Sequence, residues 1–277
     1  MNKSIIKSGN PPISSLMILF FSACLACAGQ GVFLSQSAGF CENPLGVLIE
    51  TGALYRIPLS DSKDILWKTT KIDIGLQNGW TPADDFFGLT LAFEPIAILD
   101  ITLKAGYYGM FDSFGYGYYD MRSTSSPYND KTRKDLDPSS VNGWWCMAAP
   151  RLKLKIGHAL VVDCVTADYF SMHCTGYFLE IRSYTIHKTK DIDIQNDAYA
   201  LYEVSGTVMA GANYHTIWVR GTGVFSDRLS AVALVTPELK QFESTFIAVL
   251  VGLYFRDPLF RMHAYIGAQA GFELKLK

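Results

Sequence analysis

The chain has 277 residues, of which 49% are hydrophobic and 18% are charged, and its formal net charge is −2. This length suffices for one large domain. Lysine and arginine residues are dispersed and form no basic run, so nothing in the composition indicates a nucleic-acid-binding protein.

Residues 1–28 are predicted to be a cleaved signal peptide. Lys3 and Lys7 precede an apolar stretch that begins at Leu16, and Ala26-Cys27-Ala28 fits a small-x-small cleavage site. The apolar run is short for a membrane helix of about 20 residues. Lipidation at Cys24 or Cys27 is a lesser alternative. The mature domain then covers residues 29–277.

Alternating apolar and polar residues recur along the mature chain and predict β-strands. Ile72, Ile74 and Leu76 alternate with Asp73 and Gly75, for example. A period of two places alternate side chains on opposite faces of a strand. Turn-forming residues separate the runs. We expect about twelve strands, near 45–58, 64–77, 86–94, 97–110, 143–155, 159–169, 175–188, 197–210, 213–225, 229–237, 243–256 and 260–276.

A polar stretch near 112–142 is predicted to be a long surface loop, because it combines serines, charges and prolines. Aromatic residues flank it at 116–119 and at Trp144-Trp145, and we expect them to form an interfacial belt. A twelve-strand count places this loop at the end that carries the termini, whereas long loops normally lie opposite. We therefore expect a miscount, in which a strand within Gly115–Arg122 is missed and another is merged or split, so that the even total holds but the register does not.

Residues 246–255 (FIAVLVGLYF) form the one continuous apolar run after the signal. Periodicity alone allows a helix here. Ten residues are too few for a membrane helix, so the run fits a strand whose second face is also apolar or small.

The last seventeen residues alternate without interruption. Met262, Ala264, Ile266, Ala268, Ala270, Phe272, Leu274 and Leu276 are apolar, and the residues between them are polar or small. A tilted strand that crosses a bilayer needs about 9–11 residues, so this stretch is long enough for the wall of a membrane barrel.

Four cysteines remain after signal cleavage, and an exported protein meets an oxidising compartment. A disulfide between Cys164 and Cys174, across a turn near Tyr169–His173, is the most local pairing. The alternative is that the cysteines are small apolar residues. No CxxC motif survives cleavage, so neither a metal site nor a redox motif is expected.

The C-terminus resembles the β-signal of Gram-negative outer-membrane proteins, a tag with the pattern polar-x-Gly-x-x-hydrophobic-x-hydrophobic. Gln269, Gly271, Leu274 and Leu276 match it, although the chain ends in Lys277 and not in an aromatic residue. The resemblance implies an integral outer-membrane protein, inserted by the barrel-assembly machinery and surrounded by lipid.

We therefore predict an all-β fold, a closed antiparallel transmembrane β-barrel of about twelve strands. A membrane sheet must close because backbone groups cannot stay unpaired in hydrocarbon. The competing interpretation is a secreted β-sandwich, whose strands would be shorter.

Charged side chains opposite the apolar faces are expected to line the barrel interior. They are Lys104, Arg151, Lys153, Lys155, Arg261, His263, Glu273 and Lys275. A basic stripe at 151, 153 and 155 would favour anionic solutes in a pore. Alternatively, these residues pair with Asp73, Asp100 and Glu273 and fill a closed lumen.

The sequence shows no recognisable catalytic set. No histidine stands two residues before a serine, and Asp84-Asp85 is interpreted as part of a turn. The leading hypothesis is a non-enzymatic barrel without cofactors, acting as a narrow channel for small polar or anionic solutes. Alternatives are an outer-membrane lipid-modifying hydrolase, with an active site assembled from distant strands, and a surface adhesin or structural barrel.

Overall fold

The computed structural model of the protein describes residues 31–42, 45–60, 62, 64, 66–67, 69–112, 117–121, 123 and 137–276. The predicted signal peptide lies outside the described residues. This part of the chain has no helix long and apolar enough to cross a bilayer. Its strands are β1 (Val32–Glu42), β2 (Gly46–Pro58), β3 (Lys71–Trp80), β4 (Asp84–Ile96), β5 (Leu99–Met110), β6 (Val141–Ile156), β7 (Ala159–Met172), β8 (Tyr177–Glu180), β9 (Thr185–Lys188), β10 (Lys190–Ser205), β11 (Val208–Val219), β12 (Phe225–Val235), β13 (Ser244–Arg256) and β14 (Ala264–Lys275).

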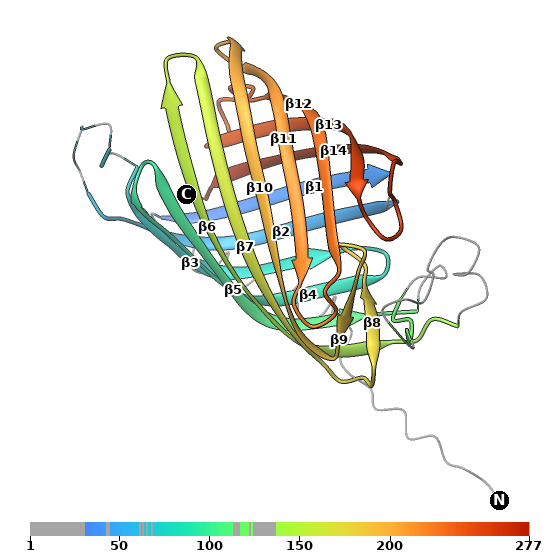
Figure 1. Ribbon diagram of the computed structural model, residues 1–277. Helices are drawn as coiled ribbons and strands as arrows, with labels where there is room; N and C mark the ends of the chain where they lie inside the picture. The colour runs from blue at the N-terminus through green and yellow to red at the C-terminus, as the bar shows by residue number, and fades with distance from the viewer. Residues whose placement is uncertain are drawn as a thin grey trace, which may run out of the picture.

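Twelve of these strands form one closed antiparallel barrel, which confirms the predicted fold class. The order around the wall is β1-β14-β13-β12-β11-β10-β7-β6-β5-β4-β3-β2, and β8 and β9 form a separate two-stranded sheet. The first and last wall strands close the barrel, from the pair Phe33 and Lys275 to the pair Glu42 and Ile266. Figure 1 shows β1 and β14 side by side at this seam. Each wall strand is therefore hydrogen-bonded on both edges.

The outer faces of the wall strands are apolar and exposed, as the alternation predicts. On β14 the exposed outer residues are Ala264, Ile266, Ala268 and Ala270. On β13, Ile247, Val249, Val251, Leu253 and Phe255 are each more than a third exposed. The inward positions of β13 carry Ala248, Leu250 and Gly252. The run 246–255 is thus a strand whose inner face is largely small or apolar.

The twelve-strand count was right in total but wrong in two places. β1 was missed because its outer face carries Gln36 and Ala38 between Leu34 and Phe40, which weakens the apolar alternation. The stretch 175–188 was counted as one wall strand but is the short hairpin of β8 and β9, outside the wall. The two errors cancel in the total.

Correct counting also resolves the position of the long loop. β5 ends at Met110 and β6 begins at Val141, both at the barrel end opposite Val32 and Lys275, and residues 113–116, 122 and 124–136 of the predicted loop lie outside the described residues. We call this the loop end, which also carries the connections 81–83, 173–189, 220–224 and 257–263. The opposite end, with Val32 and Lys275, is the terminal end. The described part of 115–122 contains isolated bridges at Tyr118 and Met121 and no wall strand.

The expected aromatic belt is only partly correct. Trp144 is 62% exposed on the outer face, but Trp145 is buried inside the barrel because adjacent strand residues point to opposite faces. Tyr118 and Tyr119 are also buried. Tyr116 lies outside the described residues. Exposed aromatics at the loop end come instead from residues on other strands: Trp80, Tyr107, Tyr169, Tyr214, Trp218 and Phe225.

The two faces of β13 should respond differently to a charge. Val249→Arg places a guanidinium on the apolar exterior and should lower the free energy of unfolding by about 2–4 kcal/mol. Ala248→Arg, on the inner face, should lower it less. Reversible unfolding of the refolded variants in lipid vesicles measures both changes. Equal losses would contradict the assignment of the outer face.

Candidate functional site in the barrel lumen

The connection 173–189 folds into the loop end of the barrel. It carries β8 and β9, which pair from Tyr177 and Lys188 to Glu180 and Thr185. The hairpin lies beside the ends of β7 and β10 (Figure 1). Phe178, Leu179 and His187 have no exposed surface, so the hairpin is packed against the wall rather than extended into solvent.

Two apolar clusters hold the hairpin from opposite sides. On one side Phe178 packs with Phe86, Tyr108, Trp145 and Phe170 of β4 to β7. On the other side Leu179 and Ile186 pack with Ile217 and Val219 of β11. Both clusters also contain residues of the 117–121 segment, namely Tyr118, Tyr119 and Met121. The loop end of the lumen is therefore largely filled by side chains.

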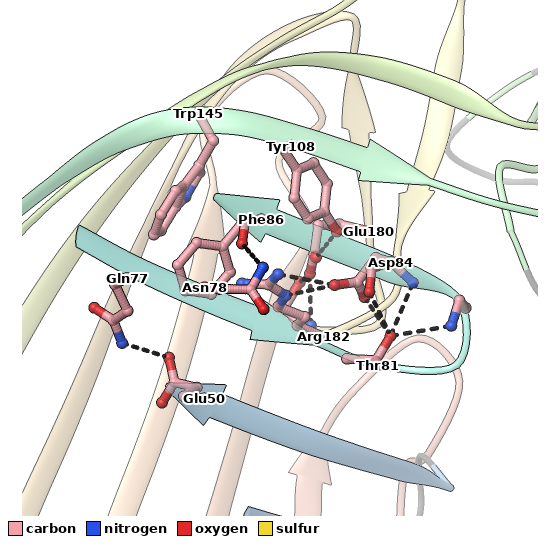
Figure 2. Close-up of polar contacts among 12 residues, drawn as sticks. Glu50, Gln77, Asn78, Thr81, Asp84, Phe86, Tyr108, Trp145, Glu180 and Arg182 are labelled. Carbon is pink, nitrogen blue, oxygen red and sulfur yellow. Dashed lines mark hydrogen bonds and ion pairs between the residues drawn. The ribbon is translucent and has the colours of Figure 1, made fainter. Parts of the chain in front are cut away.

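The tip of the hairpin is fixed by an ion pair between Arg182 and the buried carboxylate of Asp84. Nε and Nη2 of Arg182 donate to Oδ1 of Asp84 at 3.0 and 2.8 Å, and Asp84 has no exposed surface. Figure 2 shows Arg182 pointing at Asp84 beside the ring of Phe86, whose centroid lies 4.5 Å from the guanidinium carbon. Burial opposes the charge of Arg182, but the carboxylates of Asp84 and Glu180 raise its pKa overall.

Glu180 is the second buried charge of the hairpin. Its carboxylate accepts hydrogen bonds from the Tyr108 hydroxyl at 2.8 Å and from the backbone N–H and hydroxyl of Ser183 at 2.6 and 2.7 Å (Figure 2 shows the Tyr108 contact). Burial acts to raise the pKa of Glu180, but Arg182 and the bonds from Ser183 outweigh it and lower the pKa. Glu180 and Arg182 are therefore both charged at neutral pH.

His187 contacts the rings of Phe170 and Phe178, with centroid distances of 5.2 and 5.5 Å. Burial lowers its pKa to about 4, although Glu180 and Asp191 act in the opposite direction. The ring is neutral at pH 7. Its Nε2 lies 2.8 Å from Oγ1 of Thr185 and 3.7 Å from Oδ2 of Asp193. Both side chains of the Thr185 and His187 pair are buried, so lipid and bulk solvent do not reach them.

A cavity of about 350 Å³ lies against the hairpin tip inside the barrel. Glu180, Arg182 and Ser183 of the hairpin line it, and the wall contributes polar, charged and aromatic side chains from many strands. Among these, Asp168 accepts hydrogen bonds from Nε1 of Trp145 at 2.7 Å and from Nε2 of Gln195 at 3.3 Å. This size falls within the usual range for small-molecule sites, about 300–1,000 Å³.

Opposite charges pair along the lumen toward the terminal end. Arg56 bonds Asp73 at 2.7 Å and also contacts Glu273. Lys104 lies 3.5 Å from Glu50, which also accepts from Gln77 (Figure 2). Arg56 and Asp73 join the neighbouring strands β2 and β3, whereas Lys104 and Glu50 connect β5 to β2.

The basic stripe follows the same rule. Lys153 lies 2.9 Å from Asp100 and 3.5 Å from Glu94. Arg151 lies 3.8 Å from Asp100, and Lys155 lies 2.7 Å from Glu203. The three basic residues are therefore paired with carboxylates. The sequence alone did not show that these carboxylates lie beside them.

The remaining predicted interior residues are split between two locations. Lys275 and Glu273 occupy inward positions of β14, with Lys275 above the ring of Phe33. Arg261 and His263 lie in the exposed turn before β14 and not on the strand to which the alternation assigned them. In the proposed assembly signal, Gln269 and Gly271 face inward, and Leu274 lies on the outer face.

The expected disulfide is not formed, and the four cysteines of the described chain are free. Cys164 lies within β7, which continues to Met172 without the expected turn at 169–173. Eight residues of strand span about 26 Å, whereas a disulfide needs Cα atoms within about 7 Å.

Two polar groups have partners that the sequence did not reveal. Asp84 and Asp85 begin β4 and are buried, so they are not residues of an exposed turn. Asp84 and Arg182 are 98 positions apart, and no local pattern connects them. Asn213 and His215 both bind Oδ1 of Asp197, at 3.1 and 3.0 Å.

The histidines near candidate serines have other surroundings in the described residues. Ser171 and His173 form no hydrogen bond with each other, since Nδ1 of His173 contacts Asn142. His158 lies in an exposed turn. The described chain has no group of three or more histidine, cysteine, aspartate or glutamate side chains placed to hold a metal ion.

A closed barrel with an apolar exterior and a polar interior defines the class of this protein. Exposed apolar area of this extent requires lipid, and closure satisfies the backbone within it. The chain is a transmembrane β-barrel of the outer-membrane type.

No narrower family emerges from comparison with known proteins. No protein-family model and no curated protein matches the chain. Similar solved structures include the NanC porin (8% identity, 88% of this chain and 100% of that chain, TM-score 0.43). They also include the translocator domain of the autotransporter NalP from Neisseria meningitidis (12%, 95% and 94%, 0.42) and the β-domain of the Bordetella autotransporter BrkA (10%, 88% and 99%, 0.47). With TM-scores below 0.5, the class rests on the barrel itself.

Removing the cation at the hairpin tip should loosen the hairpin. Arg182→Met leaves Asp84 buried without its partner, and breaking such a pair costs about 3 kcal/mol. Amide hydrogen exchange should rise in β8 and β9 while the wall strands stay protected. Arg256→Met is the matched control, because Arg256 is 63% exposed and pairs with Asp227 at the rim. Unchanged exchange in Arg182→Met would contradict the anchoring role.

Proposed function

We propose that this protein is a non-enzymatic barrel of the bacterial outer membrane and a narrow channel for small polar solutes. The observation that carries the proposal is the lumen, where charged side chains from many strands surround a cavity under an inserted hairpin. A signal peptide at residues 1–28 and insertion by the barrel-assembly machinery, through the signal at 269–276, complete the proposal. Outer-membrane lipid is then the partner of the apolar exterior.

The β8–β9 hairpin is proposed to limit the passage. It is anchored in the loop end by two apolar clusters and by Arg182, so an open path must run beside it or follow its displacement. The wall does not depend on the hairpin for closure, because β7 pairs directly with β10 from Ser171 and Lys190 onward.

Charge selectivity of the channel should be weak. The basic stripe at 151, 153 and 155 would favour anions by itself, but Asp100, Glu94 and Glu203 pair with it. Ion preference depends on the net charge that faces the pore, and pairing removes most of that charge.

The first test is conductance in a planar bilayer. Replacing 177–188 by a short Gly-Ser turn should raise the single-channel conductance several-fold relative to the wild-type protein, because the plug is removed and the wall is kept. Heat-modifiable migration on a gel controls for folding. Unchanged conductance would remove the hairpin from the path. If neither folded protein conducts ions, the channel proposal is contradicted and a role as an adhesin or structural barrel is favoured.

The second test addresses the stripe. Lys153→Met leaves Asp100 and Glu94 without their closest cation, so the reversal potential in a salt gradient should shift toward cation preference. Lys240→Met, in the exposed turn between β12 and β13, is the control and should shift it little. An equal shift in both variants would mean that position 153 does not face the conducting path.

A further inference from the structure

Arg228 is a buried cation that the ion pairs of the lumen leave out. Its side chain lines the cavity against the hairpin, and the residue is only 8% exposed. Within the described chain its Nε atom has no hydrogen-bond partner, and no carboxylate lies within 4.0 Å of its guanidinium. A buried charge without a partner is costly, so its presence points to a ligand.

Strand alternation points Asp227 away from Arg228, and a β-bulge places another cation beside Asp227. The register between β12 and β13 shifts at this point, with Asp227 opposite Arg256 and Arg228 opposite Tyr254. As a result Arg256 meets Asp227 on the outer side, with Nε 2.6 Å from Oδ2, while Arg228 and Tyr254 face the interior. Bulges re-aim side chains in this way at functional sites.

The other nearby acid is also engaged. His215 lies opposite Arg228 in the β11–β12 register, and its Nδ1 is 3.0 Å from Asp197. Asn213 donates to the same carboxylate oxygen. Asp197 is thus held by β11 side chains instead of by Arg228.

Two tyrosines hold the Arg228 guanidinium in a fixed plane. Its central carbon lies 3.6 Å from the ring centroid of Tyr265, and Nη1 donates to the Tyr254 hydroxyl at 3.3 Å. Stacking fixes the plane of the guanidinium, whose buried Nε has no hydrogen-bond partner within the described chain. A planar fork of this kind matches the two oxygens of a carboxylate.

Each acidic side chain that lines the cavity has a hydrogen-bond or ion-pair partner other than Arg228. Glu50 pairs with Lys104, Asp168 accepts from Trp145 and Gln195, and Glu180 accepts from Tyr108 and Ser183. The unmatched group in the lining is therefore a cation, and the cavity is large enough for a small organic molecule.

We propose that this cavity binds a small organic carboxylate through Arg228. The ligand carboxylate accepts hydrogen bonds from the part of the Arg228 guanidinium that faces the cavity, while Tyr254, Tyr265 and Ile217 contact the body of the ligand. The inference goes beyond the channel proposal, because binding can be measured in detergent whether or not the barrel conducts.

Isothermal titration of the full refolded barrel with benzoate tests the proposal, with benzamide as the neutral ligand of the same shape. Benzoate should bind saturably, and benzamide should bind at least about tenfold more weakly because it has no charge to match the fork. Arg228→Met keeps the length of the side chain and should weaken benzoate by about tenfold or more. Arg228→Lys keeps the charge without the fork and should fall between the two.

Arg151→Met is the matched control, because Arg151 pairs with Asp100 and does not line the cavity; its affinity should equal that of the wild-type protein. Heat-modifiable migration and far-UV circular dichroism establish folding, and Arg228→Lys keeps the test decisive where Arg228→Met does not fold. Equal binding of benzoate and benzamide, unchanged affinity in both Arg228 variants, or no saturable binding to the wild-type protein would overturn the proposal. Tighter binding of inorganic phosphate than of benzoate would overturn the carboxylate class.

Discussion

Backbone hydrogen bonding in a medium without water is the constraint on which this structure depends. Every N–H and C=O group of a wall strand must find a partner in the neighbouring strand, and only closure supplies partners for the first and last strands. The seam between β1 and β14 meets this condition over ten residue pairs. Because closure depends on the backbone, β1 takes part even though the apolar pattern of its side chains is weak.

Closure turns one face of every strand toward a confined interior, and the charges there must be compensated locally. Pairs such as Arg56 with Asp73 and Lys153 with Asp100 bridge adjacent strands. The hairpin is compensated in the same way, because Arg182 forms an ion pair with Asp84 of the barrel wall. Apolar clusters on both sides of the hairpin then fill the loop end of the lumen.

This compensation shapes the proposed function. A lumen whose charges are paired conducts without strong preference for either sign, so the basic stripe by itself is a poor guide to selectivity. Arg228 is distinctive for the opposite reason: Asp227 and Asp197, the acids nearest to it in the register, bind other side chains. Specificity in such a barrel would come from an interior cation without an ion-pair partner among the described residues, and not from the paired charges.

The sequence by itself determined the class of fold and the face of most strands. Alternation along 97–110, 143–155 and 243–256 is a local property, and apolar exterior positions repeat every two residues whatever their neighbours are. The sequence also indicated that residues such as Lys104 and Glu273 lie on the polar face.

Only the tertiary structure decided which strands are neighbours, and therefore which charges meet. Asp84 and Arg182 come from segments 98 residues apart, and the pairing of Glu50 with Lys104 joins β2 to β5 across the lumen. The inward fold of 175–188 and the pairing of Asp227 with Arg256 at a β-bulge both depend on contacts between strands. Register is set by pairing between distant segments, so it cannot be predicted from the sequence of a single strand.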